Sequence, residues 1–124
     1  MRNTLIMAVA ALVVATPAFA EEWDFVLVNN TGKEIKLVEL APTGTQNWQK
    51  NKIDETVRKL VPIAAGKRGT IHFDKEESDC RFDVKAVFAD DTSLIWPNLN
   101  VCDNPFINLR IGAGGAPTST YTAS

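Results

Sequence analysis

The stretch Cys80-Arg81-Phe82-Asp83-Val84-Lys85-Ala86-Val87-Phe88 alternates between two kinds of side chain. One set is apolar and the other is charged over most of its length. The apolar set is Cys80, Phe82, Val84, Ala86 and Phe88, and the charged set is Arg81, Asp83 and Lys85. Successive side chains of a strand point to opposite faces of its sheet, so strict alternation predicts a half-buried β-strand.

Other short apolar segments, separated by turn residues, predict further strands. They are residues 24–29, 34–40, 70–73, 93–96 and 106–111. The first two flank Asn30-Thr31-Gly32, a favourable turn sequence, and so predict an antiparallel hairpin with Ile35 and Leu37 on one face. Pro97 is expected to end the strand at 93–96, because proline has no backbone N–H to donate.

The spacing of the apolar residues changes after a Pro/Gly/Thr loop at residues 41–46. Ile53, Val57 and Leu60 are spaced i, i+4 and i+7, which is typical of a helix with one apolar side. We therefore expect a short helix from about residue 50 to 60 that ends before Pro62, with Trp48 at its entrance.

These segments predict a mainly all-β fold: an antiparallel β-sandwich or open barrel of about six strands with one short helix. The domain spans residues 21–111. Residues 112–124 are rich in Gly, Ser and Thr and contain little to bury, so they are expected to form a flexible C-terminal tail.

Residues 1–20 have the features of a secretory signal peptide. Arg2 precedes the apolar run of residues 5–15, which is too short to span a bilayer. Ala18-Phe19-Ala20 then offers small residues for a signal peptidase, so cleavage is expected between Ala20 and Glu21. The mature chain is expected to be periplasmic or secreted, with no membrane attachment after cleavage.

Composition excludes some partner classes. The full chain of 124 residues has 13 Lys and Arg against 15 Asp and Glu. Removal of residues 1–20, which include Arg2, leaves 104 residues with 12 basic side chains against 15 acidic ones. The basic residues are scattered, which argues against nucleic acid as a partner.

The two cysteines, Cys80 and Cys102, both lie in the predicted mature chain. An even pair in an exported protein is most simply one disulfide, and it would close a loop of about 23 residues. A redox or metal-binding pair would be favoured by a Cys-x-x-Cys spacing or by nearby histidines, and the sequence has neither.

Several of these features occur together in one known group of proteins. The pattern comprises Val28-Asn29-Asn30-Thr31-Gly32, Ile35, Trp48, Cys80-x-x-Asp83-Val84-x-Ala86, the turn Asp90-Asp91 and Cys102. It resembles a group of short exported proteobacterial single-domain β proteins of unassigned function. The resemblance implies a β fold with a disulfide and supplies no catalytic residues.

Few residues are candidates for chemistry. His72 is the one histidine, and neither Ser78 nor Ser93 lies in a nucleophile-elbow sequence that would make it a partner. The acidic segment 74–79 contains Asp74, Glu76, Glu77 and Asp79, but it lacks a glycine around which a calcium loop would curl. Asn29-Asn30-Thr31 matches a glycosylation sequon and is better explained as a turn.

Trp48 is the best candidate for a binding residue, because it lies between polar residues and is free to stack on a partner or a sugar ring. We therefore expect a non-enzymatic domain that binds a protein or small molecule through loops or a sheet edge. A small-ligand or calcium carrier is the first alternative, and a hydrolase with an unrecognised site is the second. No catalytic residue, metal ligand or cofactor is predicted, and the sequence does not specify an oligomeric state.

Overall fold

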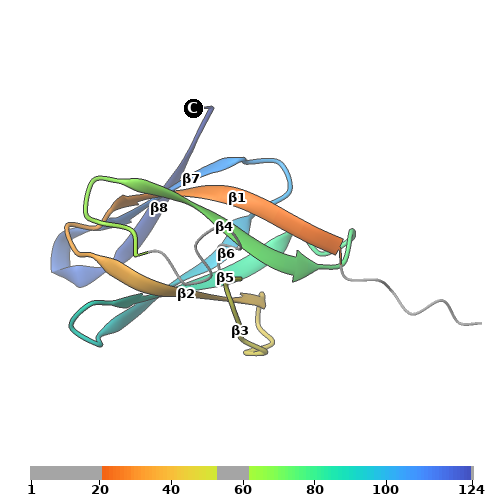
Figure 1. The fold of residues 1–124 in the computed structure, drawn as a ribbon, viewed down its shortest axis with the longest axis horizontal. Coiled ribbons are helices and arrows are strands. Elements are labelled where there is room, and N and C mark those ends of the chain that lie inside the picture. The colour runs from red at the N-terminus through yellow and green to blue at the C-terminus, as the bar shows by residue number, and fades with distance from the viewer. Residues whose placement is uncertain (1–20, 53–61, 124) are drawn as a thin grey trace, which may run out of the picture.

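The computed structural model describes residues 21–52 and 62–123. In these residues, eight strands form two four-stranded sheets that pack face to face (Figure 1). Sheet I has the order β4-β1-β7-β8, and sheet II has the order β3-β2-β5-β6. The strands are β1 Glu21–Asn30, β2 Ile35–Pro42, β3 Gln49–Lys50, β4 Arg68–Lys75, β5 Arg81–Phe88, β6 Ser93–Asn100, β7 Phe106–Ile111 and β8 Pro117–Thr122. The predicted all-β sandwich is confirmed.

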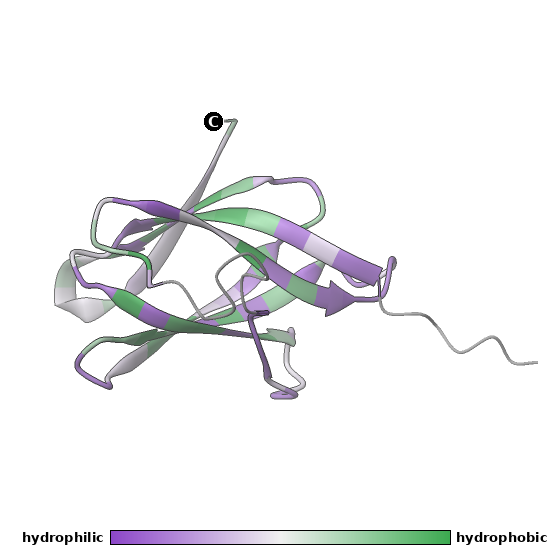
Figure 2. Cartoon of the chain, in the orientation of Figure 1, coloured by the Kyte–Doolittle hydropathy of each residue, from purple (hydrophilic) through white to green (hydrophobic). Residues whose placement is uncertain are grey.

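Alternation along the strands builds the core between the sheets. In β5, Phe82, Val84, Ala86 and Phe88 are each at most 1 % exposed, as the sequence predicts. Phe73 of β4 connects the sheets, because its ring packs edge-to-face on Phe82 at 5.3 Å between centroids. Figure 2 shows the resulting alternation of hydrophobic and hydrophilic residues along β1 and β2.

The predicted hairpin of residues 24–29 and 34–40 is wrong. β1 pairs with β4 and, in parallel, with β7, whereas β2 pairs with β3 and β5. The turn after β1 therefore carries the chain from one sheet to the other. Both strands bury an apolar face, which they can do side by side in one sheet or opposite each other in two, and the local sequence does not distinguish these arrangements.

The predicted face of β2 is also partly wrong. The register of β2 against β5 shifts between Ile35 and Leu37. Beyond this irregularity Val38 and Leu40 point into the core with Ile35, while Leu37 is half-buried. A bulge adds one residue to a strand and so reverses the face of every later side chain.

The strand at 93–96 does not end at Pro97. β6 continues to Asn100, and its register against β5 shifts between the pairs Phe82↔Leu99 and Val84↔Trp96. β6 is an edge strand, so the missing N–H of Pro97 interrupts no ladder in the interior of the sheet. Asn98 has a positive φ of 56°, and its N–H donates to Asp83 Oδ1 at 2.9 Å.

The flexible tail predicted for residues 112–124 is wrong over most of its length. A short 3₁₀ turn, Ala113–Gly115, leads into β8, which pairs antiparallel with β7. The segment buries little apolar surface, but the backbone of β7 offers it a full edge of hydrogen-bonding groups. Trp96 Nε1 also donates to the Thr118 carbonyl at 2.8 Å.

Two sequence predictions fall largely outside the described residues. The predicted signal peptide, residues 1–20, lies entirely outside them, and so do residues 53–60 of the predicted helix at 50–60. Lys50, the first residue of that predicted helix, belongs to β3. Within the described ranges, no helix is long and apolar enough to cross a membrane.

Candidate functional site

The outer face of sheet II holds Trp48 beside an ion pair. Trp48 lies just before β3 and is half-buried. Lys85, from the outward side of β5, places its Nζ 5.2 Å from the centroid of the Trp48 ring. The same Nζ lies 3.1 Å from Glu39 Oε2 of β2. The Lys85 and Glu39 side chains are 27 % and 17 % exposed, so the pair is partly shielded from water.

Strand register extends this arrangement into a continuous surface. Glu39 pairs with Lys50 on one side and with Lys85 on the other, and Lys85 pairs with Ile95 of β6. Ile95 points outward and is 43 % exposed. In the next row Leu37 pairs with Val87, and both are half-buried. We call Leu37, Glu39, Trp48, Lys85, Val87 and Ile95 the Trp48 face.

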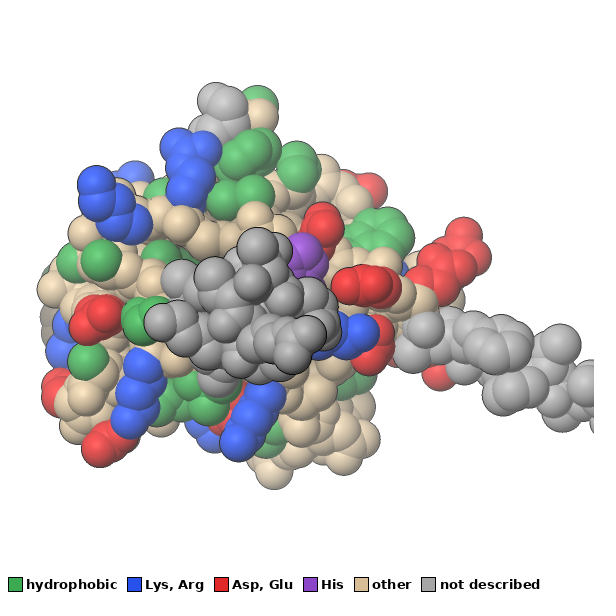
Figure 3. Space-filling model, in the orientation of Figure 1, with side chains coloured by type: hydrophobic (Ala, Val, Ile, Leu, Met, Phe, Trp, Pro, Cys, Tyr) green, Lys and Arg blue, Asp and Glu red, His purple; other side chains and the backbone are tan. Residues whose placement is uncertain are grey.

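The Trp48 face contains the kinds of side chain that are found at protein interfaces. It combines a large aromatic ring and exposed aliphatic groups with a charge pair held in place by the ring. Figure 3 shows basic and hydrophobic side chains next to one another over β2. Trp48 was predicted from the sequence, whereas Lys85, Glu39 and Ile95 were not. The run Leu94-Ile95-Trp96 carried a signal for Ile95, because three consecutive apolar residues of a strand cannot all point inward.

His72 lies on the opposite sheet, away from Trp48. It points outward from β4, while its neighbours Ile71 and Phe73 are buried. Its Nδ1 lies 3.8 Å from Asp24 Oδ2, and both side chains are exposed by more than a third. This is a surface contact between neighbouring strands, and it brings no nucleophile to the imidazole.

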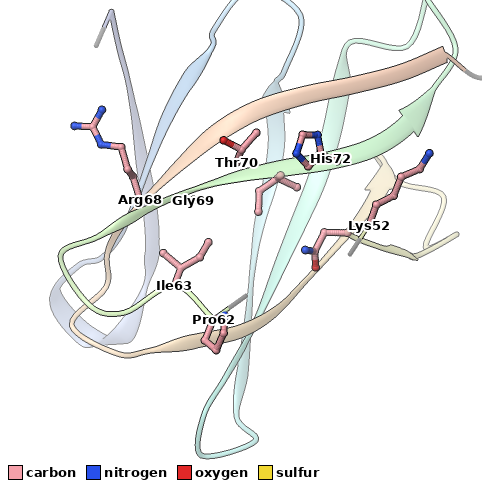
Figure 4. Close-up of a pocket in the computed structure, with 9 residues that line it drawn as sticks. Lys52, Pro62, Ile63, Arg68, Gly69, Thr70 and His72 are labelled. Atoms are coloured by element: carbon pink, nitrogen blue, oxygen red, sulfur yellow. The ribbon is translucent and has the colours of Figure 1, made fainter. Parts of the chain in front are cut away.

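A cavity of about 260 Å³ opens beside His72, on the side of the sandwich where β4 faces β2. Its residues are Asn51, Lys52, Pro62, Ile63, Arg68, Gly69, Thr70, Ile71 and His72. Figure 4 shows Arg68 and Lys52 pointing away from each other at its two ends. Lys52 Nζ pairs with Asp74 Oδ1 at 2.9 Å. The two charged groups therefore do not point toward a common position in the cavity.

The acidic segment 74–79 contains a buried lysine, Lys75. Lys75 is 3 % exposed, and its Nζ donates to the carbonyls of Glu76 and Glu77 at 2.9 and 3.3 Å. It also lies 4.2 Å from the centroid of the Trp23 ring. These carbonyls are oxygens that a calcium ion would need. In the described part of the chain, no three Asp, Glu, His or Cys side chains are grouped as a metal site.

Cys80 and Cys102 lie at disulfide distance, with their Cα atoms 5.2 Å apart. The predicted pairing is confirmed at the level of geometry. The bridge joins the start of β5 to the connection between β6 and β7. It lies next to the hydrogen bond from Val101 N–H to the Cys80 carbonyl, at 3.0 Å.

The sequon residue Asn29 is wholly buried and holds the crossing between the sheets. Its Nδ2 donates to the carbonyls of Lys33 and Ile63 at 2.7 and 2.9 Å. Its Oδ1 accepts from the N–H and hydroxyl of Thr31 at 3.1 and 2.6 Å. Every hydrogen-bonding group of this amide is used, so Asn29 serves the turn and is not available to an enzyme that modifies surface asparagines.

The carboxyl of Asp90 has a lowered pKa. The Thr92 hydroxyl and N–H donate to Asp90 Oδ1 at 2.5 and 3.1 Å, and Lys33 Nζ lies 3.2 Å from Oδ2. Hydrogen bonds from Thr92, aided by Lys33, lower the pKa of Asp90 from 3.8 to about 2. Asp91 follows with a positive φ of 68°, so this charged group belongs to the β5–β6 turn that the sequence predicts.

Comparisons with known proteins support the fold alone. No family model matches the chain, and no curated protein matches it. A protein from Eubacterium rectale, whose structure was determined by NMR, is similar with a TM-score of 0.55 and 10 % sequence identity. The match covers 84 % of this chain and 91 % of that one. The chain thus shares a sandwich architecture with a protein of very different sequence.

Proposed function

We propose that the protein is an exported, non-enzymatic binding domain that recognises a partner protein through the Trp48 face. The observation that carries the proposal is the half-buried Trp48 ring beneath the Lys85 ammonium, at 5.2 Å, in a surface that also exposes Ile95. Aromatic residues surrounded by aliphatic and polar groups are typical of the energetic centres of protein interfaces.

The ion pair gives this surface a fixed shape. Lys85 contacts both the Trp48 ring and Glu39. Because these contacts already hold Lys85 and Glu39 in place, neither of these two side chains needs to be ordered when a partner binds. Ordering a long side chain at an interface costs about 0.5 to 1.5 kcal/mol, and a preorganised surface avoids that cost.

Export is part of the proposal. It rests on the signal-like sequence of residues 1–20, and the Cys80–Cys102 pair supports it, since disulfides persist in oxidising compartments. Mass spectrometry of the protein purified from an exporting host tests this directly. We expect the mass of a chain that begins at Glu21, and the mass of the uncleaved chain would contradict export.

Site-specific photo-crosslinking tests the binding face. A photoreactive amino acid replaces Ile95 on the face or, as a matched control, Lys67, which is exposed in the turn before β4. In living cells of the source organism, we expect discrete adducts from position 95 and none of the same mass from position 67.

Variants of Trp48 make the test specific. Trp48→Ala should abolish the adduct, while Trp48→Phe, which keeps an aromatic ring, should largely retain it. Thermal melts establish that both variants fold. Equal labelling from positions 67 and 95, or an adduct that survives Trp48→Ala in a folded protein, would overturn the proposal.

A further inference from the structure

The outer face of sheet I, on the opposite side of the molecule from the Trp48 face, separates its charges by sign along the strands. Outward residues of β1 and β4 pair as Glu22↔Asp74, Asp24↔His72, Val26↔Thr70 and Val28↔Arg68. β7 continues the last rows, since Val28 pairs with Asn108 and Asn30 with Arg110. One end of the face is therefore acidic and the other is basic. We call it the sheet I face.

Figure 3 shows the same separation. Acidic side chains gather at the right-hand end, where β1 begins and β4 ends, and basic ones lie at the upper left, over the other ends of these strands. Glu22 and Asp74 are directly opposite each other, and like charges in that position destabilise a sheet.

The basic end is also incompletely paired. Within residues 21–52 and 62–123, neither Arg68 nor Arg110 forms an ion pair with a carboxylate. The Arg68 guanidinium lies 5.8 Å from the centroid of the Phe106 ring, and both arginines are exposed. At the acidic end Asp74 already pairs with Lys52. The charges that a partner of opposite sign would neutralise are therefore Glu22 at that end and Arg68 and Arg110 at the other.

Between the two ends the surface is less polar. Val26, Val28 and Phe106 are half-buried on neighbouring strands, and the β8 residues Thr118, Thr120 and Thr122 extend the surface to the edge of the sheet. The face therefore has an apolar strip between an acidic end and a basic end.

We propose that the sheet I face binds a second copy of this chain, and that two copies form a symmetric dimer with these sheets packed face to face. A two-fold axis must lie in the plane of such an interface. An axis parallel to the strands would bring acidic end against acidic end. An axis perpendicular to the strands places the acidic end of each copy over the basic end of the other, so the charges select this geometry.

The symmetry brings defined residues together. The strands of the two copies run in opposite directions, and the row of Glu22 and Asp74 of one copy faces the region of Arg68 in the other. Each such contact occurs twice in the dimer. The axis then passes between the row of Asp24 and His72 and the row of Val26 and Thr70, so these two rows face each other across the interface.

The size of the face fits a weak dimer. Four strands about 4.8 Å apart and about eight residues long present roughly 500 Å² of flat area. A stable interface of standard size buries about 800 Å² of accessible surface on each partner, and a face of roughly 500 Å² falls below that class, among weak and transient interfaces. We therefore expect dissociation in the micromolar range and a strong dependence on salt.

Sedimentation equilibrium of the exported protein tests the dimer. At low salt we expect a reversible monomer–dimer equilibrium, which raising the NaCl concentration from about 0.05 to 0.5 M shifts toward monomer because salt screens exposed charges. A protein that stays monomeric up to sub-millimolar concentration at low salt would overturn the proposal.

Charge reversals identify the face. Arg68→Glu and, separately, Glu22→Arg each place like charges opposite one another and should weaken the dimer by at least about tenfold. The chain that carries both changes has an acidic residue at position 68 and a basic one at position 22. Opposite charges then face each other again, so dimerisation should recover. Lys50→Glu makes the same kind of change on sheet II and serves as the matched control, with no effect expected.

Other outcomes are equally clear. A dimer that Arg68→Glu leaves unchanged, or that the double variant fails to restore while it remains folded by circular dichroism, would show that another surface is used. Monomeric protein that binds an anionic resin through Arg68 would replace the second copy with an anionic polymer as the occupant. Neither result would affect the test of the Trp48 face, because the two faces lie on different sheets.

Discussion

Lys75 Nζ lies 4.2 Å from the centre of the Trp23 ring, and the lysine side chain is buried almost completely at the end of sheet I. Among the described residues its polar contacts are backbone carbonyls, those of Glu76 and Glu77, and no carboxylate forms an ion pair with it. The charge is thus stabilised by an aromatic face and two peptide dipoles. Through these two carbonyls, Lys75 holds the backbone of the acidic segment 74–79 in place.

We expect Lys75→Met to lower the free energy of unfolding by about 1 to 2 kcal/mol, because methionine keeps most of the packed stem and loses the charge-assisted hydrogen bonds and the cation–π contact. Urea unfolding measures the loss. A double-mutant cycle with Trp23→Leu isolates the contact itself, and additive effects of the two substitutions would show that the pair is not coupled.

Removal of the disulfide should also destabilise the domain. In Cys80→Ser with Cys102→Ser, the unfolded chain regains the freedom of a loop of about 23 residues, so we expect a loss of about 3 kcal/mol. Urea unfolding of the wild-type protein with and without reductant provides the comparison. If reductant has no effect on the wild type and mass spectrometry finds free thiols, the bridge does not form in the exported protein.

Asn29→Ala should cost about 3 kcal/mol, since it leaves buried backbone groups of the crossing without partners. Asn30→Ala is the matched control, because the neighbouring amide is exposed and its Nδ2 donates to Asn108 Oδ1 at 3.3 Å instead of to buried backbone carbonyls. Asn29→Asp sharpens the test, since a carboxylate of the same shape cannot donate to the Lys33 and Ile63 carbonyls. Near wild-type stability of Asn29→Asp would contradict a role for these donors.

Asp90 should contribute to acid denaturation. Its pKa is about 2 in the folded protein and near 3.8 when unfolded, so its contribution to stability is complete above pH 3.8 and is lost as the pH falls through about 2. We expect Asp90→Asn to make unfolding less sensitive to pH between these values. Denaturant midpoints measured across that range test this, and parallel curves for the two proteins would rule out the contribution.

A part of the fold could be predicted from local sequence alone. Alternation from Cys80 to Phe88 identified both the strand and its buried face, because side chains of a strand must point alternately to its two sides. Alternation in β4 likewise buries Ile71 and Phe73 and turns His72 outward. The disulfide pair followed from an even cysteine count together with the predicted export.

The failures concern partners rather than elements. Asn30-Thr31-Gly32 predicted a reversal of the chain, which occurs, but not that β1 would leave β2 and pair in parallel with β7, some eighty residues later in the sequence. β8 was missed because its stability comes from hydrogen bonds to the edge of β7, and backbone hydrogen bonds leave little trace in composition.

The candidate site divides in the same way. Trp48 could be identified from the sequence as an unusual aromatic residue in a polar loop. Only the register of β2, β5 and β6 brings Glu39, Lys85 and Ile95 to it, and only the pairing of β1, β4 and β7 separates acidic from basic residues on the opposite face. The sequence by itself determined which side chains of β5 turn inward or outward, because that period is a property of the extended backbone. For β2 the same period failed beyond the register shift after Ile35. The tertiary structure alone decided which outward side chains become neighbours, because strand order and register depend on contacts between residues far apart in the chain.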